Sequence, residues 1–306
     1  MRYVILADSD NVEPFKIPRQ LEKINGESLI ERTIRLLKEN RVKDILITSH
    51  DERFDNLGAK RYEPQFNSYN GKKQIGYWLD AFPIELLNEP LNEPITFLLG
   101  DVYFSDNAIK TIVESKTDSV LFFCSSKKDG YGKDYIKTHD EPFGFKVIDC
   151  ELFKNHIKKL KDMFDKGLTR RHPIAWELYR SINGIDVNTH QLISNYIPIN
   201  DVTCDIDRVE DIFLLELKGG DKMAKVRVKV KEFFSLGKFN ELEELVRANA
   251  ENDKYGELYA GDTFLCTKEM AEYLSGKNKY GKSFLEEEIL EVIPDEKPKR
   301  KRKKKE

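Results

Sequence analysis

The stretch that decides the fold lies near the start of the chain. Residues 3–21 read YVILADSDNVEPFKIPRQL, and residues 23–37 read KINGESLIERTIRLL. The apolar run YVILA is typical of a short buried strand. Apolar residues then recur at helical spacing and predict an amphipathic helix over residues 28–40. These residues are Leu29, Ile30, Ile34 and Leu37.

Similar segments alternate as far as residue 218. Apolar runs predict strands at 45–49, 58–62, 95–99 and 119–124, and amphipathic stretches predict helices at 72–87 and 108–115. This alternation is typical of a three-layer α/β fold, in which helices cover both faces of a mainly parallel, Rossmann-like sheet. Ligands bind such sheets beyond the carboxyl ends of the strands, so functional residues are expected directly after strands.

The composition indicates a globular protein with a well-solvated surface. Of the 306 residues, 40% are hydrophobic and 34% are charged, and the net charge is −3. This balance argues against a nucleic-acid-binding domain, and no apolar run is long enough to span a membrane. We expect a cytoplasmic protein whose cysteines, which form no CxxC pair, are buried free thiols. The cysteines are Cys124, Cys150, Cys204 and Cys266.

The composition changes at residues 218–222, which read KGGDK. The paired glycines indicate a linker over 219–223, which separates a domain over 1–218 from a small α+β module over 224–294. Further elements are predicted in the module: strands at 226–230, 257–266 and 284–293, and helices at 240–249 and 267–275. Residues 295–306 form a basic run that is expected to be disordered and solvated, with nucleic-acid contact as the less favoured alternative.

Short motifs follow one another in a specific order along the predicted first domain. Pro18-Arg19-Gln20-Leu21 precedes Gly26-Glu27-Ser28-Leu29-Ile30. Gly100-Asp101 ends an apolar strand, and Asp205-Ile206-Asp207 begins the last motif. In this order and spacing, the motifs resemble those of the GT-A-like superfamily of NTP transferases. The resemblance covers residues 1–218 and implies the fold of the nucleotide-diphospho-sugar transferases.

The resemblance implies catalytic and metal-binding roles. Arg19, with Lys16, would stabilise the charge of a triphosphate, and a guanidinium suits this role because it can hold two phosphate oxygens at once. Asp101 would act in catalysis and bind Mg²⁺ together with Asp207, while Asp205 is the second choice as a ligand. Taken alone, Arg19 is more readily an ordinary surface arginine, and Asp101 is equally well a residue of a turn or a helix cap.

The resemblance also implies where the nucleotide binds. The residues expected to contact it are Leu6, Ala7, Asp8, Ser9 and Gly100, and Gln74 is expected to contact the base. The family normally has a glycine-rich turn after the first strand, where this chain has ADSDN at residues 7–11. Aspartate and asparagine tolerate left-handed backbone conformations better than most residues, so the turn can still form.

A cationic cluster stands in the segment GLTRRHPIAWELY, residues 167–179. Arg170, Arg171 and His172 precede a predicted helix that begins at Pro173, and a cluster at the start of a helix suits a phosphate-bearing acceptor. An exposed basic turn is the alternative. Trp176 and Tyr179, three positions apart on that helix, are expected to be packing residues.

The resemblance implies a reaction in which NMP passes from an NTP to a phosphorylated small molecule, such as a sugar or polyol phosphate, with release of pyrophosphate. The glycine-free turn leaves open an alternative, which is a catalytically inactive nucleotide-binding domain fused to an interaction module. Residues 255–274 have a weak similarity to small bacteriophage proteins, so the module is a possible assembly element, with a host cytoplasm or a virion as its setting.

Overall fold

The computed structural model describes residues 1–7, 15, 17–65, 69–70, 73–74, 76–88, 94–132, 135, 137 and 139–218, followed by five strands in the C-terminal part. The chain divides into two compact units, Met1–Asp207 and Arg208–Glu306. The domain limits expected from the sequence, 1–218 and 224–294, stay predictions. No helix in the described residues is both long and apolar enough to cross a membrane.

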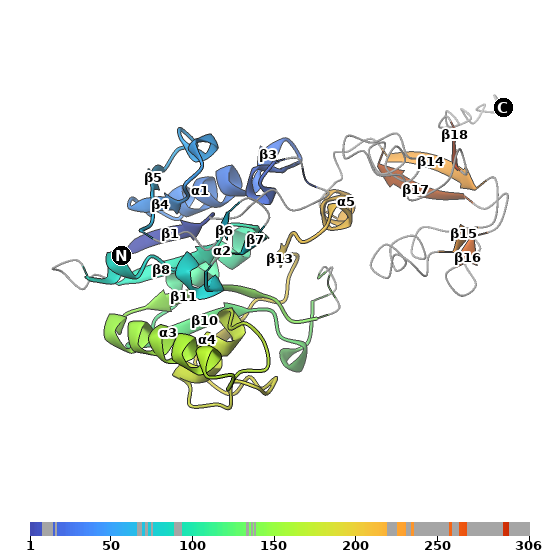
Figure 1. Ribbon diagram of the computed structural model, residues 1–306. Coiled ribbons are helices and arrows are strands. Elements are labelled where there is room, and N and C mark those ends of the chain that lie inside the picture. Colours follow the sequence, from blue (N-terminus) through green and yellow to red (C-terminus); the bar gives the residue numbers. More distant parts are fainter. Residues whose placement is uncertain are drawn as a thin grey trace, which may run out of the picture. The chain divides into compact units, whose positions relative to one another are not determined.

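The first unit is built on a seven-stranded sheet (Figure 1) with the order β12-β10-β11-β8-β1-β4-β5. All neighbouring strands run parallel except at β11, which is antiparallel to both β10 and β8. The strands are β1 (Arg2–Leu6), β4 (Ile45–Thr48), β5 (Lys60–Tyr62), β8 (Ile95–Leu99), β10 (Val120–Cys124), β11 (Pro142–Val147) and β12 (Tyr196–Pro198). The mainly parallel α/β sheet predicted from the sequence is confirmed.

Helices cover both faces of this sheet (Figure 1). They are α1 (Leu29–Glu39), α2 (Asp106–Glu114), α3 (Cys150–Asp165) and α4 (Ala175–Ile182). Successive residues of β11 reach opposite layers. The Phe145 ring lies 5.5 Å from that of Phe153 in α3, whereas Lys146 Nζ donates to the Ile112 carbonyl oxygen of α2 at 2.7 Å. Because strand side chains alternate between faces, α2 and α3 lie on opposite sides.

Side-chain caps fix where the helices begin. Ser28 accepts a hydrogen bond from the Glu31 N–H, and the Glu31 side chain accepts one from the Ser28 N–H, which is a complete capping box for α1. The side chains of Ser105 and Asp149 each accept a hydrogen bond from the N–H three residues later and cap α2 and α3. Helices α1 and α2 begin within two residues of the helices predicted at 28–40 and 108–115.

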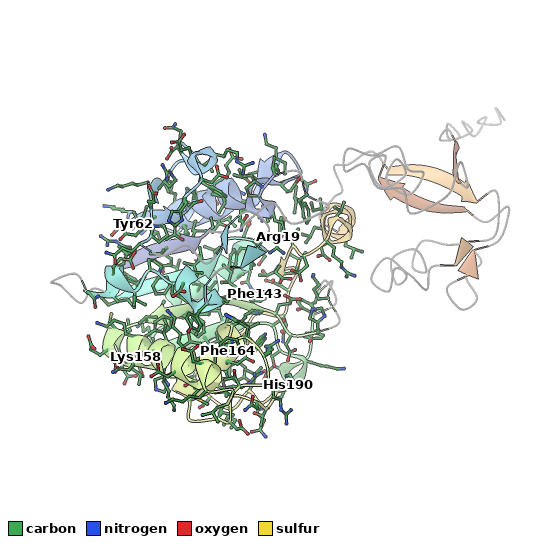
Figure 2. All side chains as sticks on the ribbon, viewed as in Figure 1. Arg19, Tyr62, Phe143, Lys158, Phe164 and His190 are labelled. Carbon is green, nitrogen blue, oxygen red and sulfur yellow. The ribbon has the colours of Figure 1, made fainter. Side chains whose placement is uncertain are left out.

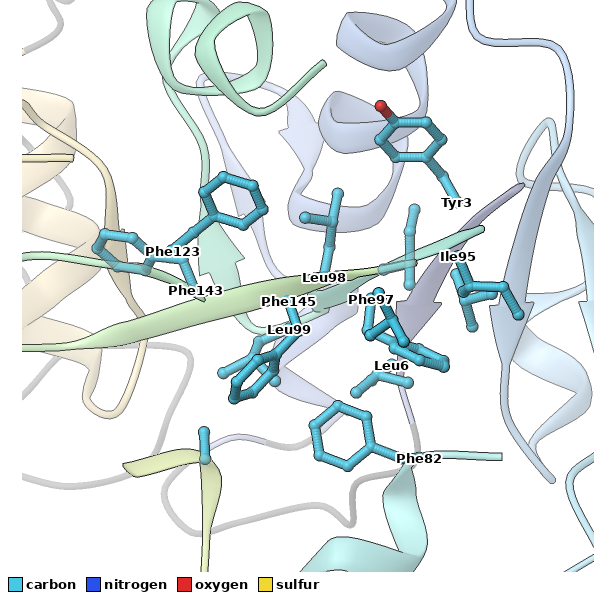
Figure 3. Packing of buried hydrophobic residues seen from close by; sticks show 14 of the residues in the cluster. Tyr3, Leu6, Phe82, Ile95, Phe97, Leu98, Leu99, Phe123, Phe143 and Phe145 are labelled. Atoms are coloured by element: carbon cyan, nitrogen blue, oxygen red, sulfur yellow. The ribbon is translucent and has the colours of Figure 1, made fainter. Parts of the chain in front are cut away.

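Aromatic residues dominate the core between the sheet and α3 (Figure 3). Phe82 lies 5.3 Å from both Phe97 and Phe153 and 5.8 Å from Phe145, in edge-to-face arrangements. Figure 3 shows Phe82, Phe97 and Phe145 on one face of the sheet, while Leu98 points to the other face.

The prediction of a helix over residues 72–87 is wrong. The structure has β7 (Lys73–Gln74), which pairs with β6 (Tyr69–Asn70), and then the 3-10 helices Trp78–Ala81 and Ile84–Asn88. Pro83 explains the interruption, because proline lacks an N–H and pushes the preceding residue out of the helical region. Phe82 accordingly has φ −81° and ψ 110°.

Small two-stranded ribbons and short turns complete the first unit. They are β2 (Lys23–Ile24) with β3 (Glu27–Ser28), β9 (Val102–Tyr103) with β13 (Cys204–Asp205), and the 3-10 helices Arg19–Leu21, Glu52–Phe54 and Lys127–Asp129. Three of the cysteines are buried free thiols as predicted: Cys124, Cys150 and Cys204.

The second unit begins with α5 (Val209–Lys218), and its strand β14 (Lys225–Val230) pairs antiparallel with β17 (Thr263–Thr267) and β18 (Leu290–Ile293). A further ribbon joins β15 (Phe234–Ser235) to β16 (Glu257–Leu258). The strand predicted at 226–230 is confirmed, and that predicted at 257–266 is divided into β16 and β17. The helices predicted at 240–249 and 267–275 and the tail at 295–306 lie outside the described residues.

Candidate active site

Acidic residues from distant parts of the chain meet at one edge of the sheet. Asp101 follows the end of β8, where the parallel strands have their carboxyl ends. Strand β13 pairs with β9, which places Asp205 opposite Val102, and the Ile206 N–H donates to the Asp101 carbonyl oxygen at 2.9 Å. This short ribbon therefore brings the Asp205–Asp207 motif to Asp101.

Arg19 lies between two of these aspartates. Its guanidinium donates to Asp101 Oδ2 and to Asp207 Oδ1, each at 2.9 Å, and to the Ile206 carbonyl oxygen at 2.9 Å. Only 14% of the Arg19 side chain is exposed. Burial lowers the pKa of Arg19, but the charges of the neighbouring aspartates outweigh this and raise it. Arg19 is a fixed positive charge at the edge of the sheet.

Two further charged residues, Glu141 and Lys137, complete the cluster. Lys137 Nζ lies 3.3 Å from Asp205 Oδ1, 3.8 Å from Asp207 Oδ2 and 4.0 Å from Glu141 Oε1. Glu141 is 3% exposed. Burial, and next the facing Asp205 carboxyl group, raise the pKa of Glu141, and burial raises that of Asp205. Two buried carboxyl groups that face each other repel when both are ionised, which favours a proton held between them.

Glu141 was missed in the sequence because its position depends on strand direction. It directly precedes β11, and β11 runs antiparallel to β8. The start of an antiparallel strand lies at the edge where its parallel neighbours end, so Glu141 reaches the same edge as Asp101. The sequence shows a carboxylate before an apolar run, but it does not show that the strand formed by this run is antiparallel to its neighbours.

The acidic cluster fits a hard divalent cation. One oxygen each from Glu141, Asp205 and Asp207 lies within 4.8 Å of the others. Asp205 Oδ1 and Glu141 Oε1 are buried, and a basic side chain lies beside each: Lys137 Nζ is 3.3 Å from the former and His139 Nε2 is 2.7 Å from the latter. With Asp101, the cluster holds four carboxylates against the two cations Arg19 and Lys137, so a divalent ion would balance the formal charge. Asp101 itself is paired with Arg19 and lies outside the three-residue group.

A cavity of about 640 Å³ opens at this edge. Its lining contains Arg19, Asp101, Glu141, Asp205 and Asp207. The lining also contains residues that follow α3 in the chain. Figure 2 shows two of the lining residues, Arg19 and His190, at separate positions. These further lining residues are Arg171, Ile174, Trp176, Arg180, His190 and Leu192. The cavity thus has an acidic region at the sheet edge and a basic region near α4.

The structure separates the three residues predicted to bind the acceptor. Arg171 lines the cavity and pairs with Glu177, with Nε 3.0 Å from Oε1. Arg170 is exposed, and its N–H donates to Asn188 Oδ1. His172 packs on Phe164, with ring centroids 4.6 Å apart. Only Arg171 of the three lines the cavity, and the acceptor-binding role stays a prediction.

Helix α4 begins two residues later than predicted. Ile174 is the N-cap and Ala175 the first helical residue, so Pro173 lies outside the helix. The cause is the Ile174 N–H, which donates to Glu177 Oε2 at 3.0 Å and closes the first turn there. Trp176 and Tyr179 both pack on Phe122, at 5.2 and 4.9 Å, although Trp176 also lines the cavity.

The structure describes only some of the residues that were predicted to bind the nucleotide. Leu6 lines the cavity, Ala7 is fully buried, and the Gly100 N–H donates to the Leu6 carbonyl oxygen at 2.9 Å. Gln74 lies in β7 without a described side chain. Asp8, Ser9 and Lys16 lie outside the described residues.

No protein-family model and no curated protein sequence matches the chain. Among solved structures, it is similar to a Bacillus anthracis protein named a glucose-1-phosphate thymidylyltransferase, at 14% identity and a TM-score of 0.46 over 72% of this chain and 96% of that one. CTP:phosphocholine cytidylyltransferase from Streptococcus pneumoniae is similar at 18% identity and a TM-score of 0.41, over 72% and 99% of the chains.

A third solved structure, 2-C-methyl-D-erythritol 4-phosphate cytidylyltransferase from Thermus thermophilus, is similar at 13% identity and a TM-score of 0.44, over 72% and 98% of the chains. The three neighbours are nucleotidyltransferases by name.

Proposed function

We propose that the chain is a magnesium-dependent nucleotidyltransferase, which transfers NMP from an NTP to a phosphorylated small molecule, a sugar or polyol phosphate, and releases pyrophosphate. The observation that carries this proposal is the meeting of Arg19 with Asp101 and Asp207 at the carboxyl edge of the sheet, on the wall of a cavity. A guanidinium held between carboxylates there combines a phosphate-binding cation with cation-binding oxygens.

Transfer requires little covalent help from the protein. An oxygen of the acceptor phosphate attacks the α-phosphorus, the bond to the β-phosphate oxygen breaks, and pyrophosphate leaves with the electron pair. Positioning and neutralisation of charge supply most of the acceleration in such reactions. The task of the chain is therefore to align two anionic phosphates that repel each other.

Arg19 is suited to bind the leaving pyrophosphate, with Lys16 as a predicted second cation. Its guanidinium is held by Asp101, Asp207 and the Ile206 carbonyl, so its position is fixed before substrate arrives. The carboxylates of Asp205, Asp207 and Glu141, with Asp101 beside them, would hold Mg²⁺, which neutralises phosphate charge when it is bound.

A pyrophosphate-release screen tests the function. The full chain is incubated with Mg²⁺, each common NTP and a panel of sugar and polyol phosphates, and we expect release with at least one pair. Release must depend on both substrates and stop when EDTA is added. If every pair is silent although an NTP raises the melting temperature, the chain is instead the catalytically inactive nucleotide-binding domain.

A further inference from the structure

The basic region of the cavity contains a buried arginine that the proposed reaction does not use. Arg180 lies on α4, is 3% exposed, and lines the cavity. Its Nη1 donates to Glu177 Oε1 at 3.2 Å and to the Val187 carbonyl oxygen at 3.4 Å. Its Nε is buried and has no partner among the described residues. A buried guanidinium with an unused donor is costly unless a ligand meets it.

Glu177 has no capacity left for that donor. Its two carboxylate oxygens already accept from Arg171 at 3.0 and 3.3 Å, from the Ile174 N–H at 3.0 Å and from Arg180 Nη1 at 3.2 Å. The missing acceptor must therefore come from elsewhere.

The charges point to the kind of ligand. Arg171, Glu177 and Arg180 carry two positive charges against one negative, and the side chains of Glu177 and Arg180 are only 5% and 4% exposed. Burial, and the neighbouring charge of Arg171, lower the pKa of Arg180, while Glu177 opposes this. Arg171 is 49% exposed, whereas Arg180 is held away from water and shares its one carboxylate partner with Arg171, which favours an anion beside Arg180.

The basic region and the reacting centre are built from different segments of the chain. Arg171 and Arg180 come from α4 and the turn before it, whereas Asp101 follows β8 and Asp205 lies in β13. The attacking phosphate has to reach the region of Arg19 and Asp101, so a group that meets Arg180 belongs to another part of the bound molecule. Trp176, whose ring centroid lies 5.8 Å from the Arg180 guanidinium carbon, adds an apolar wall beside it.

We propose that Arg180, together with Arg171, binds a second anionic group of the acceptor, a carboxylate or phosphate that takes no part in the reaction. The acceptor is then a small molecule with acidic groups at both ends. This inference rests on the proposed function only in calling the ligand an acceptor, because anion binding at Arg180 requires no turnover.

The first test measures binding of inorganic phosphate and of malonate to the full chain by calorimetry, without NTP or Mg²⁺. We expect Arg180→Gln to weaken binding of the preferred anion about tenfold, as for the loss of one charge-assisted hydrogen bond. Glu177→Gln removes the compensating negative charge but keeps an oxygen for the Ile174 N–H, and it should tighten binding about tenfold. Arg35, an arginine paired with Glu27 and Glu39 outside the cavity, provides the control Arg35→Gln.

The tighter anion binding expected of Glu177→Gln keeps the test decisive even if Arg180→Gln folds poorly. If Arg171, Glu177 and Arg180 had a purely structural role, Glu177→Gln would show no gain in anion affinity. Comparison of phosphate with malonate shows which anion the site prefers. The inference is overturned if Glu177→Gln binds neither anion more tightly than the wild type, or if folded Arg180→Gln binds both as the wild type does.

The second test uses an acceptor found in the pyrophosphate screen. If Arg180 binds a group remote from the reaction, Arg180→Gln raises KM for the acceptor with little change in kcat. A fall in kcat at unchanged KM would mean that Arg180 acts on the reacting phosphate, and it would overturn the inference. Anion binding without any turnover would instead refute the proposed function and leave the anion site standing.

Discussion

At the scale of residues, the site is an arrangement of compensated charges. Arg19 forms ion pairs with both Asp101 and Asp207, and Lys137 lies beside the carboxylate of Asp205. Each cation holds carboxylates in place that would otherwise repel one another. A proton held between Glu141 and Asp205 would supply the remaining compensation, and a bound divalent cation would displace it, since ligand carboxylates must be deprotonated.

Replacement of Glu141 by glutamine tests this compensation. Burial and Asp205 raise the pKa of Glu141 to about 11 from an ordinary value of 4.5. The folded protein therefore keeps a proton that the unfolded chain releases above pH 4.5, and stability falls as the pH rises past that value. Glutamine mimics the protonated acid, so Glu141→Gln should be more stable than the wild type near neutral pH by roughly 2 kcal/mol.

The stability gain should shrink towards pH 4.5, and the same variant should bind Mg²⁺ more weakly than the wild type. Urea unfolding at several pH values and Mg²⁺ titration measure the two effects. A variant that is less stable than the wild type at every pH would show that Glu141 is ionised and satisfied in the fold.

The sequence allowed only some of these residues to be recognised. Arg19, Asp101 and Asp207 each stand in a short motif, and the order of the motifs predicted that they meet. Glu141 and Arg180 stand in no motif. Their places follow from the reversal of β11 and from the packing of α4, which are long-range properties that local pattern does not encode.

At the scale of elements, the junction of β1 and β8 sets the position of Asp101. Gly100 lies where the end of β8 approaches the end of β1, and its N–H donates to the Leu6 carbonyl oxygen. A Cβ atom at Gly100 would lie 2.5 Å from that oxygen. The close approach of the two backbones requires glycine here.

Gly100→Ala should therefore separate the strand ends and displace Asp101. We expect a loss of about 1–3 kcal/mol in the free energy of unfolding, typical of overpacking a well-packed site, and a weaker affinity for Mg²⁺. Denaturant unfolding and Mg²⁺ titration check both effects. Wild-type values for both would show that the backbone contact is unimportant for the site.

The 3-10 segments between β7 and β8 depend on the aromatic core. Phe82 joins the two short helices and packs on Phe97, Phe145 and Phe153. The periodic pattern of residues 72–87 predicted one helix because the apolar positions suit a buried face, but Pro83 divides it. The sequence indicated that the apolar side chains of this segment are buried, but it did not indicate that the backbone forms two 3-10 helices.

Phe82→Ala should remove this anchor at a cost of about 3–5 kcal/mol, the usual loss for a fully buried phenylalanine. Phe164→Ala is the matched control, since Phe164 is half-buried at the end of α3 and should cost much less. Thermal unfolding of both variants checks the difference. Equal losses would contradict the packing described for Phe82.

At the scale of the whole molecule, the first unit carries a cavity with an acidic region at the sheet edge and a basic region beside α4. An NTP with its cation suits the former and an anionic acceptor suits the latter, so one cavity can hold two substrates of like charge. The alternation of strands and helices predicted the sheet and its functional edge, and the sequence also indicated a cationic cluster that includes Arg171. The antiparallel strand and the place of Arg180 emerged only from the structure. The role of the second unit stays a prediction.

The most direct test of the account is pyrophosphate release by Asp101→Ala, measured at saturating Mg²⁺ and NTP with an acceptor from the screen. Asp106→Ala is the control, since Asp106 is 78% exposed and pairs with Arg32 away from the cavity. We predict that Asp101→Ala lowers the rate by more than about a hundredfold, as for loss of a cation-binding carboxylate, while Asp106→Ala keeps the wild-type rate. Full activity of Asp101→Ala would contradict the assignment of the active site.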